Sequence, residues 1–238
     1  MTSSSSAFSA PSIAERVAEV QARIDAACHA AGRDPADVIL TAVSKTQAPE
    51  AIDAILATGQ RIFGENRVQE AQGRWADRRG ALPGLELRLI GPLQTNKAED
   101  AVALFDVIET LDREKLARAL AQAGEKRGRS PRVLVQVNTG AEPQKSGVLP
   151  DAADALIAAA RDIYGLTVEG LMCIPPADQG AGPHFQMLRD MAERHGLSVL
   201  SMGMSGDYET AIRCGATHVR VGTALFGERT RPETPSSS

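Results

Sequence analysis

The sequence predicts an α/β protein that forms a single (β/α)₈ TIM-type barrel with an extra helix at its N-terminus. Eight short apolar runs are each followed by a segment with helical spacing or helix-end signals. Strict alternation of strands and helices requires parallel strands joined by right-handed crossovers. Eight such units within roughly 190 residues fit the small end of this barrel's size range. A doubly wound open sheet is the alternative, but it usually has fewer strands, and no GxGxxG follows the first strand here.

The expected domain organisation is one barrel, residues 12–229, between two short polar tails. Residues 1–11 are rich in Ser and Ala, and residues 230–238 read TRPETPSSS, so both tails are expected to be disordered. No internal linker of comparable length interrupts the rest, which favours a single domain. The first element of the body is a helix over 12–31, because Ser12 and Glu15 form a capping box and Gly32 supplies an end signal.

The alternation begins after this helix, with runs such as VILTAVS that are typical of buried parallel strands. The strands are expected at 38–44, 61–64, 86–90, 106–109, 132–137, 166–172, 198–201 and 217–221. Helices are expected at 49–58, 66–79, 94–104, 112–126, 150–161, 183–194 and 207–213, with a last turn after the eighth strand. Gly59 ends the helix expected at 49–58.

Composition excludes several classes of function. The net charge is −4 and aromatic residues make up 3% of the chain, so neither a basic field nor base-stacking surfaces favour nucleic-acid binding. No apolar run approaches the roughly 20 residues of a membrane span, and the N-terminus lacks signal-peptide features. The three cysteines form no CxxC pair, and the four histidines show no HxxxH or HExxH spacing. A cytoplasmic protein without a metal site is therefore expected.

The first strand ends in a lysine of particular interest. Side chains alternate along a strand, so Thr41, Val43 and Lys45 share one face. If this face is the barrel interior, Lys45 lies at the floor of a pocket, where burial favours the neutral amine. A neutral amine can form a Schiff base with a carbonyl compound. The alternative is an ordinary lysine exposed to solvent at a strand end.

The last two strand-end loops indicate an anion site. They read SMGMSGD (201–207) and RVGTALFGER (220–229), and their glycines, hydroxyls and two following helix N-termini suit a phosphate. The alternative is that these glycines only make tight turns. Arg220 faces the pocket if Val219 and Val221 face the helices. A lysine, a phosphate site and an inward arginine suggest either pyridoxal 5′-phosphate or an aldol-type sugar phosphate as the bound carbonyl compound.

Six stretches of the chain resemble the pyridoxal phosphate homeostasis family, whose barrel is of the alanine racemase type. In chain order they are AVSKTQ, FGENRVQE, LIGPLQTNK, VNTGAEPQKSG, GLMCIPP and LSMGMSGDYETAIRCGATHVRVGTALFGER. The resemblance implies that Lys45 carries pyridoxal 5′-phosphate, that Arg220 contacts its pyridine nitrogen, and that Asn66 lies beside the ring. It also implies a cofactor-lining Met204 and a phosphate site. The implied phosphate ligands are Ser205, Gly222 and Thr223.

Two residues depart from the family pattern. Arg67 stands where many relatives have tyrosine, and Arg88 stands where a histidine is common. Lys97 and Lys145 lie beyond the ends of strands three and five, where they either attract phosphate or accept the cofactor transiently, or are simply solvated. Neither a catalytic residue nor a metal ligand is predicted.

The family resemblance implies a protein that holds, buffers or delivers pyridoxal 5′-phosphate without efficient turnover. A permanently charged arginine at the pyridine nitrogen weakens the ring as an electron sink. Racemases of this type add a base from a second domain and a partner subunit, whereas here only Tyr164 and Tyr208 offer tyrosine hydroxyls. An amino-acid racemase is the alternative, and a class I aldolase is a third hypothesis. The expected partners are pyridoxal-phosphate-dependent apoenzymes, and the expected state is a monomer or weak dimer.

Overall fold

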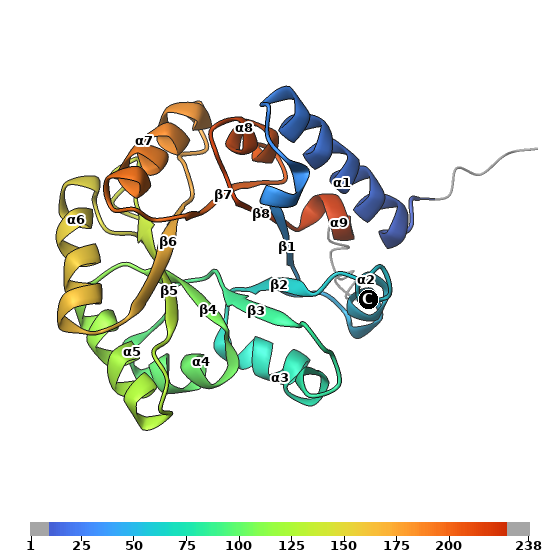
Figure 1. Ribbon diagram of the computed structural model, residues 1–238. Helices are drawn as coiled ribbons and strands as arrows, with labels where there is room; N and C mark the ends of the chain where they lie inside the picture. Colours follow the sequence, from blue (N-terminus) through green and yellow to red (C-terminus); the bar gives the residue numbers. More distant parts are fainter. Residues whose placement is uncertain (1–9, 228–238) are drawn as a thin grey trace, which may run out of the picture.

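The computed structural model describes residues 10–227, which form a closed barrel of eight parallel strands surrounded by helices (Figure 1). The predicted fold class is confirmed. The strands pair in chain order, and β1 closes the barrel against β8 through pairs such as Thr41 with Arg220. The strands are β1 Ile39–Val43, β2 Ile62–Glu65, β3 Glu86–Leu89, β4 Val107–Leu111, β5 Arg132–Val137, β6 Thr167–Cys173, β7 Val199–Met204 and β8 His218–Val221.

The helices follow the strands as expected, with differences at their ends. They are α1 Ile13–Ala30, α2 Pro49–Ala57, α3 Val68–Arg79, α4 Ala98–Leu104, α5 Glu114–Lys126, α6 Pro150–Ala158, α7 Ala181–Arg194, α8 Tyr208–Arg213 and α9 Thr223–Phe226. A 3₁₀ turn, Thr95–Lys97, precedes α4, and a π-helical turn, Ala159–Ile163, follows α6. The tail 230–238 and residues 1–9 of the other tail lie outside the described residues.

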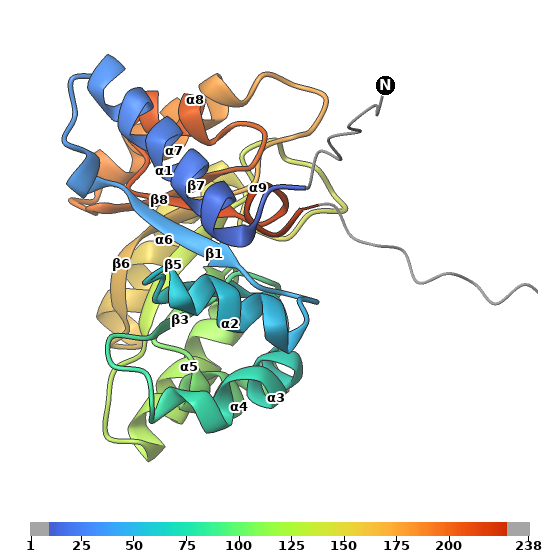
Figure 2. The same ribbon diagram turned by 90° about the vertical axis from the view of Figure 1, so that its right-hand side faces the viewer.

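The extra helix α1 has a structural role at the barrel wall. The capping box at Ser12 and Glu15 is present, and Ala31 ends the helix before the left-handed Gly32. The helices α8 and α9 are only six and four residues long. Helix α1 packs against both of them, which covers the part of the wall that they leave open (Figures 1 and 2).

Two strands differ from prediction by more than one residue at an end, and both have irregular pairing. The fourth strand was expected at 106–109 but runs over Val107–Leu111, with a register shift against β5. The seventh was expected to end at Ser201 but continues to Met204, with a register shift against β8 and a positive φ of 92° at Gly203. Bulges re-aim strand ends and are not visible in an alternation pattern. The extension of β7 carries Met204 to the mouth of the barrel.

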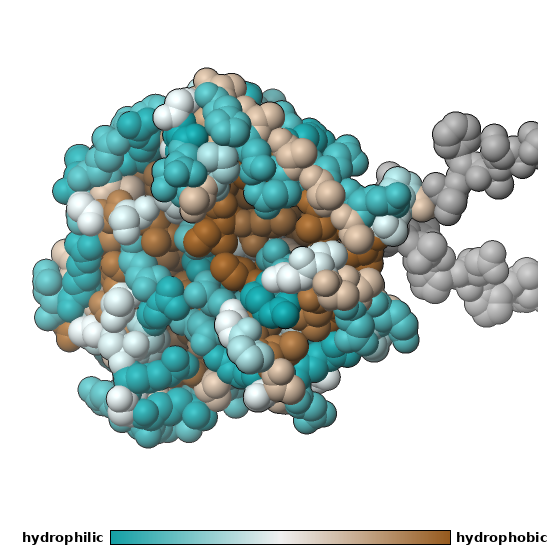
Figure 3. Space-filling view, turned by 45° about the vertical axis from the view of Figure 1, so that its right-hand side comes forward, coloured by the Kyte–Doolittle hydropathy of each residue, from teal (hydrophilic) through white to brown (hydrophobic). Residues whose placement is uncertain are grey.

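The core has two parts of different character. The larger apolar cluster fills the layer between the barrel and its helices, whereas the apolar cluster inside the barrel contains Val107, Leu134 and Met172. The rest of the barrel interior includes buried charged side chains. The space-filling view shows apolar residues toward the centre of one hollowed face, with hydrophilic residues around its rim (Figure 3). Among residues 10–227, none of the helices combines the length and apolar character needed to cross a bilayer.

Candidate functional site

A cavity of about 340 Å³ opens at the carboxyl ends of the strands and brings together four of the seven predicted site residues. Lys45 and Asn66 follow β1 and β2, Met204 ends β7, and Arg220 lies one residue before the end of β8. The whole lining set is Val43, Lys45, Asn66, Ile90, Gly91, Pro92, Gln136, Gln144, Lys145, Ser146, Ile174, Met204 and Arg220. The site therefore lies where barrels of this class place their functional residues.

Lys45 reaches the cavity because β1 alternates as predicted. Thr41 is buried inside the barrel beside Gly64, and Val43 and Lys45 line the cavity above it. Lys45 itself is half-buried. The next residue, Thr46, has a positive φ of 63° and donates its hydroxyl to the Lys45 carbonyl oxygen at 2.6 Å. This turn ends the strand direction directly after Lys45, so the chain leaves the barrel toward α2.

Asn66 is held against the neighbouring strand end by an unusually close approach. A Cβ atom placed on Gly91 would lie 2.2 Å from the Asn66 carbonyl oxygen and 2.7 Å from its Cα. Only a residue without a side chain allows these two backbones to meet at such distances. Because both residues line the cavity, Gly91 sets the position of the loop that presents Asn66.

Arg220 enters the cavity from its floor, and its side chain is fixed from below. Its exposed fraction is 3%, whereas Val219 and Val221 are fully buried in the outer apolar layer, as the alternation predicted. Nη1 donates to the Ser201 hydroxyl at 2.7 Å, and Nη2 donates to the Cys173 carbonyl oxygen at 2.9 Å. Burial raises the pKa of the Cys173 thiol to about 12, which agrees with a small core residue rather than a reactive one.

The predicted phosphate-binding residues lie at the edge of this cavity rather than among its lining residues. Ser205 follows the cavity-lining Met204, and its hydroxyl accepts a hydrogen bond from the Gly222 amide at 3.4 Å. A Cβ atom on Gly222 would be 3.4 Å from the Val43 Cβ atom, so the seventh and eighth loops meet beside β1. Thr223 begins α9. The two helices that follow these loops are short, so amides and hydroxyls are the groups available to an anion.

The two further lysines are separated by the structure. Lys145 lines the cavity, donates to the Pro175 carbonyl oxygen at 3.0 Å and pairs with Glu142 at 2.6 Å. Lys97 is not part of the lining set, and its ammonium is 3.7 Å from the Asp100 carboxylate. Gln136 and Ser146 are lining residues that the sequence analysis missed. Gln136 lies on the inward face of β5. A polar residue within the apolar run RVLVQV is the sequence feature that could have indicated its position at the site.

The two departures from the family pattern have different surroundings. The Arg67 side chain is 76% exposed and pairs with Glu70 at 3.3 Å, outside the cavity lining. Arg88 is 1% exposed inside the barrel, where it pairs with Glu86 and Glu109 at 2.5 Å each. The departure at Arg88 therefore affects the barrel interior, whereas the departure at Arg67 affects a helix surface.

Neither tyrosine reaches the cavity. Tyr208 is buried on the outside of the barrel, with the Arg23 guanidinium 5.4 Å from its ring centroid. The Tyr164 hydroxyl donates to Glu114 at 2.6 Å and lies just before β6, away from the carboxyl ends of the strands. Neither hydroxyl is a candidate base for a ligand in this cavity. No cluster of His, Cys, Asp and Glu within 10–227 suits a metal ion.

Comparison with known proteins gives consistent results. The protein-family model described as the alanine racemase N-terminal domain matches residues 16–230. A pyridoxal phosphate homeostasis protein of Pseudomonas aeruginosa is 45% identical over 91% of this chain and 96% of its own length. The protein of the same name from Escherichia coli K12 is 38% identical over 91% of this chain and 97% of its own length.

The solved structures agree with these relatives. The structure of PipY from Synechococcus elongatus without pyridoxal phosphate has a TM-score of 0.80 at 38% identity, covering 90% of this chain and all of that chain. PipY with pyridoxal phosphate bound has a TM-score of 0.76 at 36% identity over the same shares. An alanine racemase from Clostridium difficile has a TM-score of 0.67 at 14% identity, so this likeness shows the fold alone. The match covers 93% of this chain and 59% of that chain.

Proposed function

We propose that this chain, which belongs to the pyridoxal phosphate homeostasis family and carries an alanine racemase N-terminal domain, binds pyridoxal 5′-phosphate and holds it for delivery. The observation that carries this proposal is the shared cavity of Lys45 and Arg220. An amine that follows β1 and a buried guanidinium on the neighbouring strand β8 share one small cavity. These are the groups that a phosphorylated aldehyde with a ring nitrogen requires.

The residues present fit this ligand. A cavity of about 340 Å³ lies within the range of small-molecule sites, roughly 300–1,000 Å³. Val43, Ile90 and Ile174 supply apolar walls for a ring, and the Gly222 amide and Ser205 hydroxyl supply polar groups at the edge for a phosphate. The proposal assigns Lys45 to covalent attachment, Arg220 to the ring nitrogen, Asn66 and Met204 to the ring faces, and Ser205, Gly222 and Thr223 to the phosphate.

The same residues favour holding over turnover. Pyridoxal phosphate, when bound, supplies an aldehyde that reacts with amines and a ring that withdraws electrons. Arg220 keeps its own proton, so it stabilises an unprotonated ring nitrogen and weakens that withdrawal. Neither tyrosine lines the cavity to act as a second base. The names of the curated relatives likewise do not favour the racemase alternative.

The proposal extends to the location, the oligomeric state and the partners of the protein. We place the protein in the cytoplasm, as a monomer or weak dimer, with pyridoxal-phosphate-dependent apoenzymes as recipients. Free cysteines at positions 28, 173 and 214 suit a reducing compartment.

Borohydride reduction tests the site. The purified protein is incubated with pyridoxal phosphate, its visible absorbance is recorded, and the reduced adduct is located by mass spectrometry. We expect a yellow species and one adduct on Lys45, lost in Lys45→Ala. Lys97→Ala is the matched control, because Lys97 is not part of the cavity lining and its loss leaves the adduct unchanged. An unmodified wild-type protein, or an adduct that persists on another lysine in Lys45→Ala, contradicts the assignment.

A further inference from the structure

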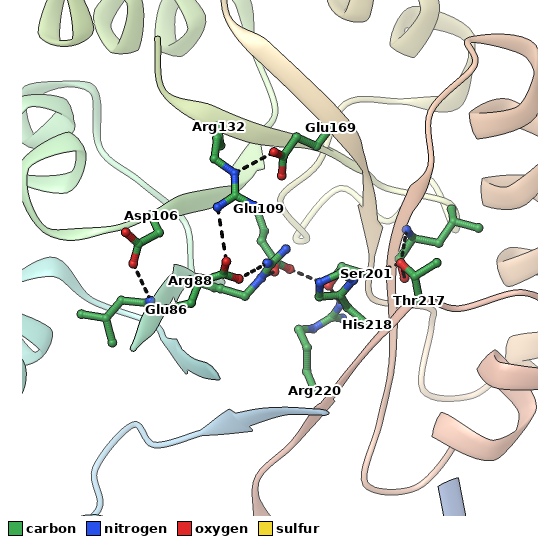
Figure 4. A network of polar contacts seen from close by, with 12 residues as sticks. Glu86, Arg88, Asp106, Glu109, Arg132, Glu169, Ser201, Thr217, His218 and Arg220 are labelled. Carbon is green, nitrogen blue, oxygen red and sulfur yellow. Dashed lines mark hydrogen bonds and ion pairs between the residues drawn. The ribbon is translucent and has the colours of Figure 1, made fainter. Parts of the chain in front are cut away.

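A cluster of charged groups crosses the barrel interior and ends at Arg220 (Figure 4). It is made of Glu86, Arg88, Glu109, Arg132, Glu169 and Arg220, which are buried toward the Arg220 end and partly exposed at the Arg132 end. Arg220 donates from Nη1 to the Ser201 hydroxyl at 2.7 Å, and that hydroxyl donates to Glu109 Oε2 at 2.5 Å. The other Glu109 oxygen accepts from Arg88 Nε at 2.5 Å. At the far end, Arg88 Nη1 donates to Glu86 at 2.5 Å. Arg132 donates to the same Glu86 at 3.2 Å and to Glu169 at 2.6 Å.

The four groups nearest the cavity are shielded from water. Arg88, Glu109, Ser201 and Arg220 are each 3% exposed or less. Three arginines and three glutamates balance within the cluster, so each buried charge has a partner. Burial by itself raises the pKa of the Glu109 carboxyl, but Arg88, Arg220 and the Ser201 hydroxyl outweigh that effect and hold the pKa below its usual value. Glu109 is therefore an anion beneath the cavity floor.

This arrangement constrains the Arg220 guanidinium from one side only. Two of its nitrogens are bound to Ser201 and to the Cys173 carbonyl oxygen, and the residue also lines the cavity. A guanidinium is planar, so fixing two of its nitrogens fixes the direction of its remaining N–H donors. Without the Glu109 anion, Arg88 and Arg220 would be two buried cations with no carboxylate between them. Arg220 would then be driven toward the open cavity by repulsion and by loss of its anchor.

We propose that Glu109, acting through Ser201, is the positioning residue that orients Arg220 toward the ring nitrogen of the bound cofactor. This inference rests on the proposed function, because it assigns the ligand-facing side of Arg220 to pyridoxal phosphate. Glu109 touches no ligand and acts only through the serine hydroxyl. Of these three residues, the family resemblance assigns a role only to Arg220. Tertiary contacts bring Glu109 and Ser201, which are 92 positions apart in sequence, together beside it.

Two variants test the inference at different strengths. Ser201→Ala removes the bridging hydroxyl but leaves the Arg88–Glu109 pair intact, so the barrel keeps its balanced charges. Glu109→Gln removes the anion and keeps the side-chain shape. The matched control is Glu169→Gln, which removes the same charge from the same cluster at the end bound to Arg132, away from Ser201. Circular dichroism checks that each variant folds.

The readouts are the Kd for pyridoxal phosphate and the visible spectrum of the bound cofactor, followed against pH. We expect Ser201→Ala to raise Kd about tenfold, as loss of one buried charge-assisted hydrogen bond implies, and to move the absorbance band or the pH midpoint of its change. Glu109→Gln is expected to have a larger effect, and Glu169→Gln to leave both readouts at the wild-type values. A change in stability alone would not move the spectrum.

The outcomes separate this inference from the proposed function. Wild-type protein that takes up no pyridoxal phosphate contradicts the proposed function. Wild-type protein that binds it, with an unchanged Kd and an unchanged band in Ser201→Ala, contradicts the role of Glu109 and Ser201 only. Equal effects of Glu109→Gln and Glu169→Gln also contradict it, because they reduce the result to a general loss of charge. If Glu109→Gln fails to fold, Ser201→Ala still decides the question.

Discussion

At the scale of single residues, the pKa of His218 shows how burial in the barrel changes the protonation of a titratable side chain. It is the first residue of β8 and is 6% exposed, and its Nδ1 lies 3.0 Å from the Thr217 hydroxyl oxygen. Burial, together with the charge of Arg88, lowers its pKa from 6.5 to about 4 against the opposing charges of Glu109 and Glu86. The imidazole is therefore neutral in the folded protein near pH 7.

His218 leads to a prediction about acid stability. Its folded-state pKa lies below the unfolded value, so the unfolded chain takes up the proton first. The stabilising contribution is complete above pH 6.5 and is lost as the pH falls toward 4. Each tenfold difference in proton affinity between the two states corresponds to about 1.4 kcal/mol, so the full loss is about 3 kcal/mol.

Urea unfolding at pH 7.5 and pH 4.5 measures this loss. We expect wild type to lose about 2–3 kcal/mol more than His218→Gln over this interval. The carboxylates of the cluster are present in both proteins, so the comparison isolates His218. Equal losses in the two proteins contradict the prediction.

At the scale of elements, the junction between the second and third strand ends depends on a glycine. Gly91 follows β3 and meets the backbone of Asn66, which follows β2. We expect Gly91→Ala to push the Asn66 loop away from the cavity, which lowers stability and weakens pyridoxal phosphate binding. Thermal unfolding and a binding titration measure the two effects.

Gly73 provides the matched control for this substitution. It lies in the exposed face of α3, and a Cβ atom there has no neighbour within 4 Å. Gly73→Ala should raise stability by about 0.5–1 kcal/mol, because alanine favours the helix, and should leave the binding unchanged. Gly91→Ala protein that binds as tightly as Gly73→Ala protein would show that the close approach is not needed.

At the scale of the whole molecule, barrel closure makes every strand depend on two neighbours. The β1–β8 pairing joins the first and last strands, so the described sheet has no free edge. Trp75, the only tryptophan in the chain, lies on the buried face of α3, and its ring centroid is 4.6 Å from that of Phe63 on β2. Its fluorescence reports the β2–α3 unit, whereas far-ultraviolet circular dichroism reports all helices.

Closure predicts that both signals change together on unfolding. In urea we expect one transition with the same midpoint by fluorescence and by circular dichroism. The reason is that loss of one strand opens the ring and exposes the edges of its neighbours. Two separated midpoints would show that the β2–α3 region unfolds independently of the rest of the barrel.

Features that repeat at short range can be predicted from the sequence alone. Alternation of strand and helix signals predicts the barrel, and alternation along two strands predicts that Lys45 and Arg220 face inward, because side-chain direction has a period of two. The capping box of α1 is equally local. Each of these depends on residues a few positions apart, so each is visible in the sequence.

Which groups from distant parts of the sequence come into contact is visible in the tertiary structure and not in the sequence. The structure places bulges in β4 and β7, and it places Lys145 but not Lys97 at the cavity. It also brings Glu109, Ser201 and Arg220, which are far apart in sequence, into contact. A polar residue in a strand shows that a partner is required, because an unpaired buried charge is costly. It does not show which strand supplies that partner, since strand register and the bulges within it place the two side chains side by side.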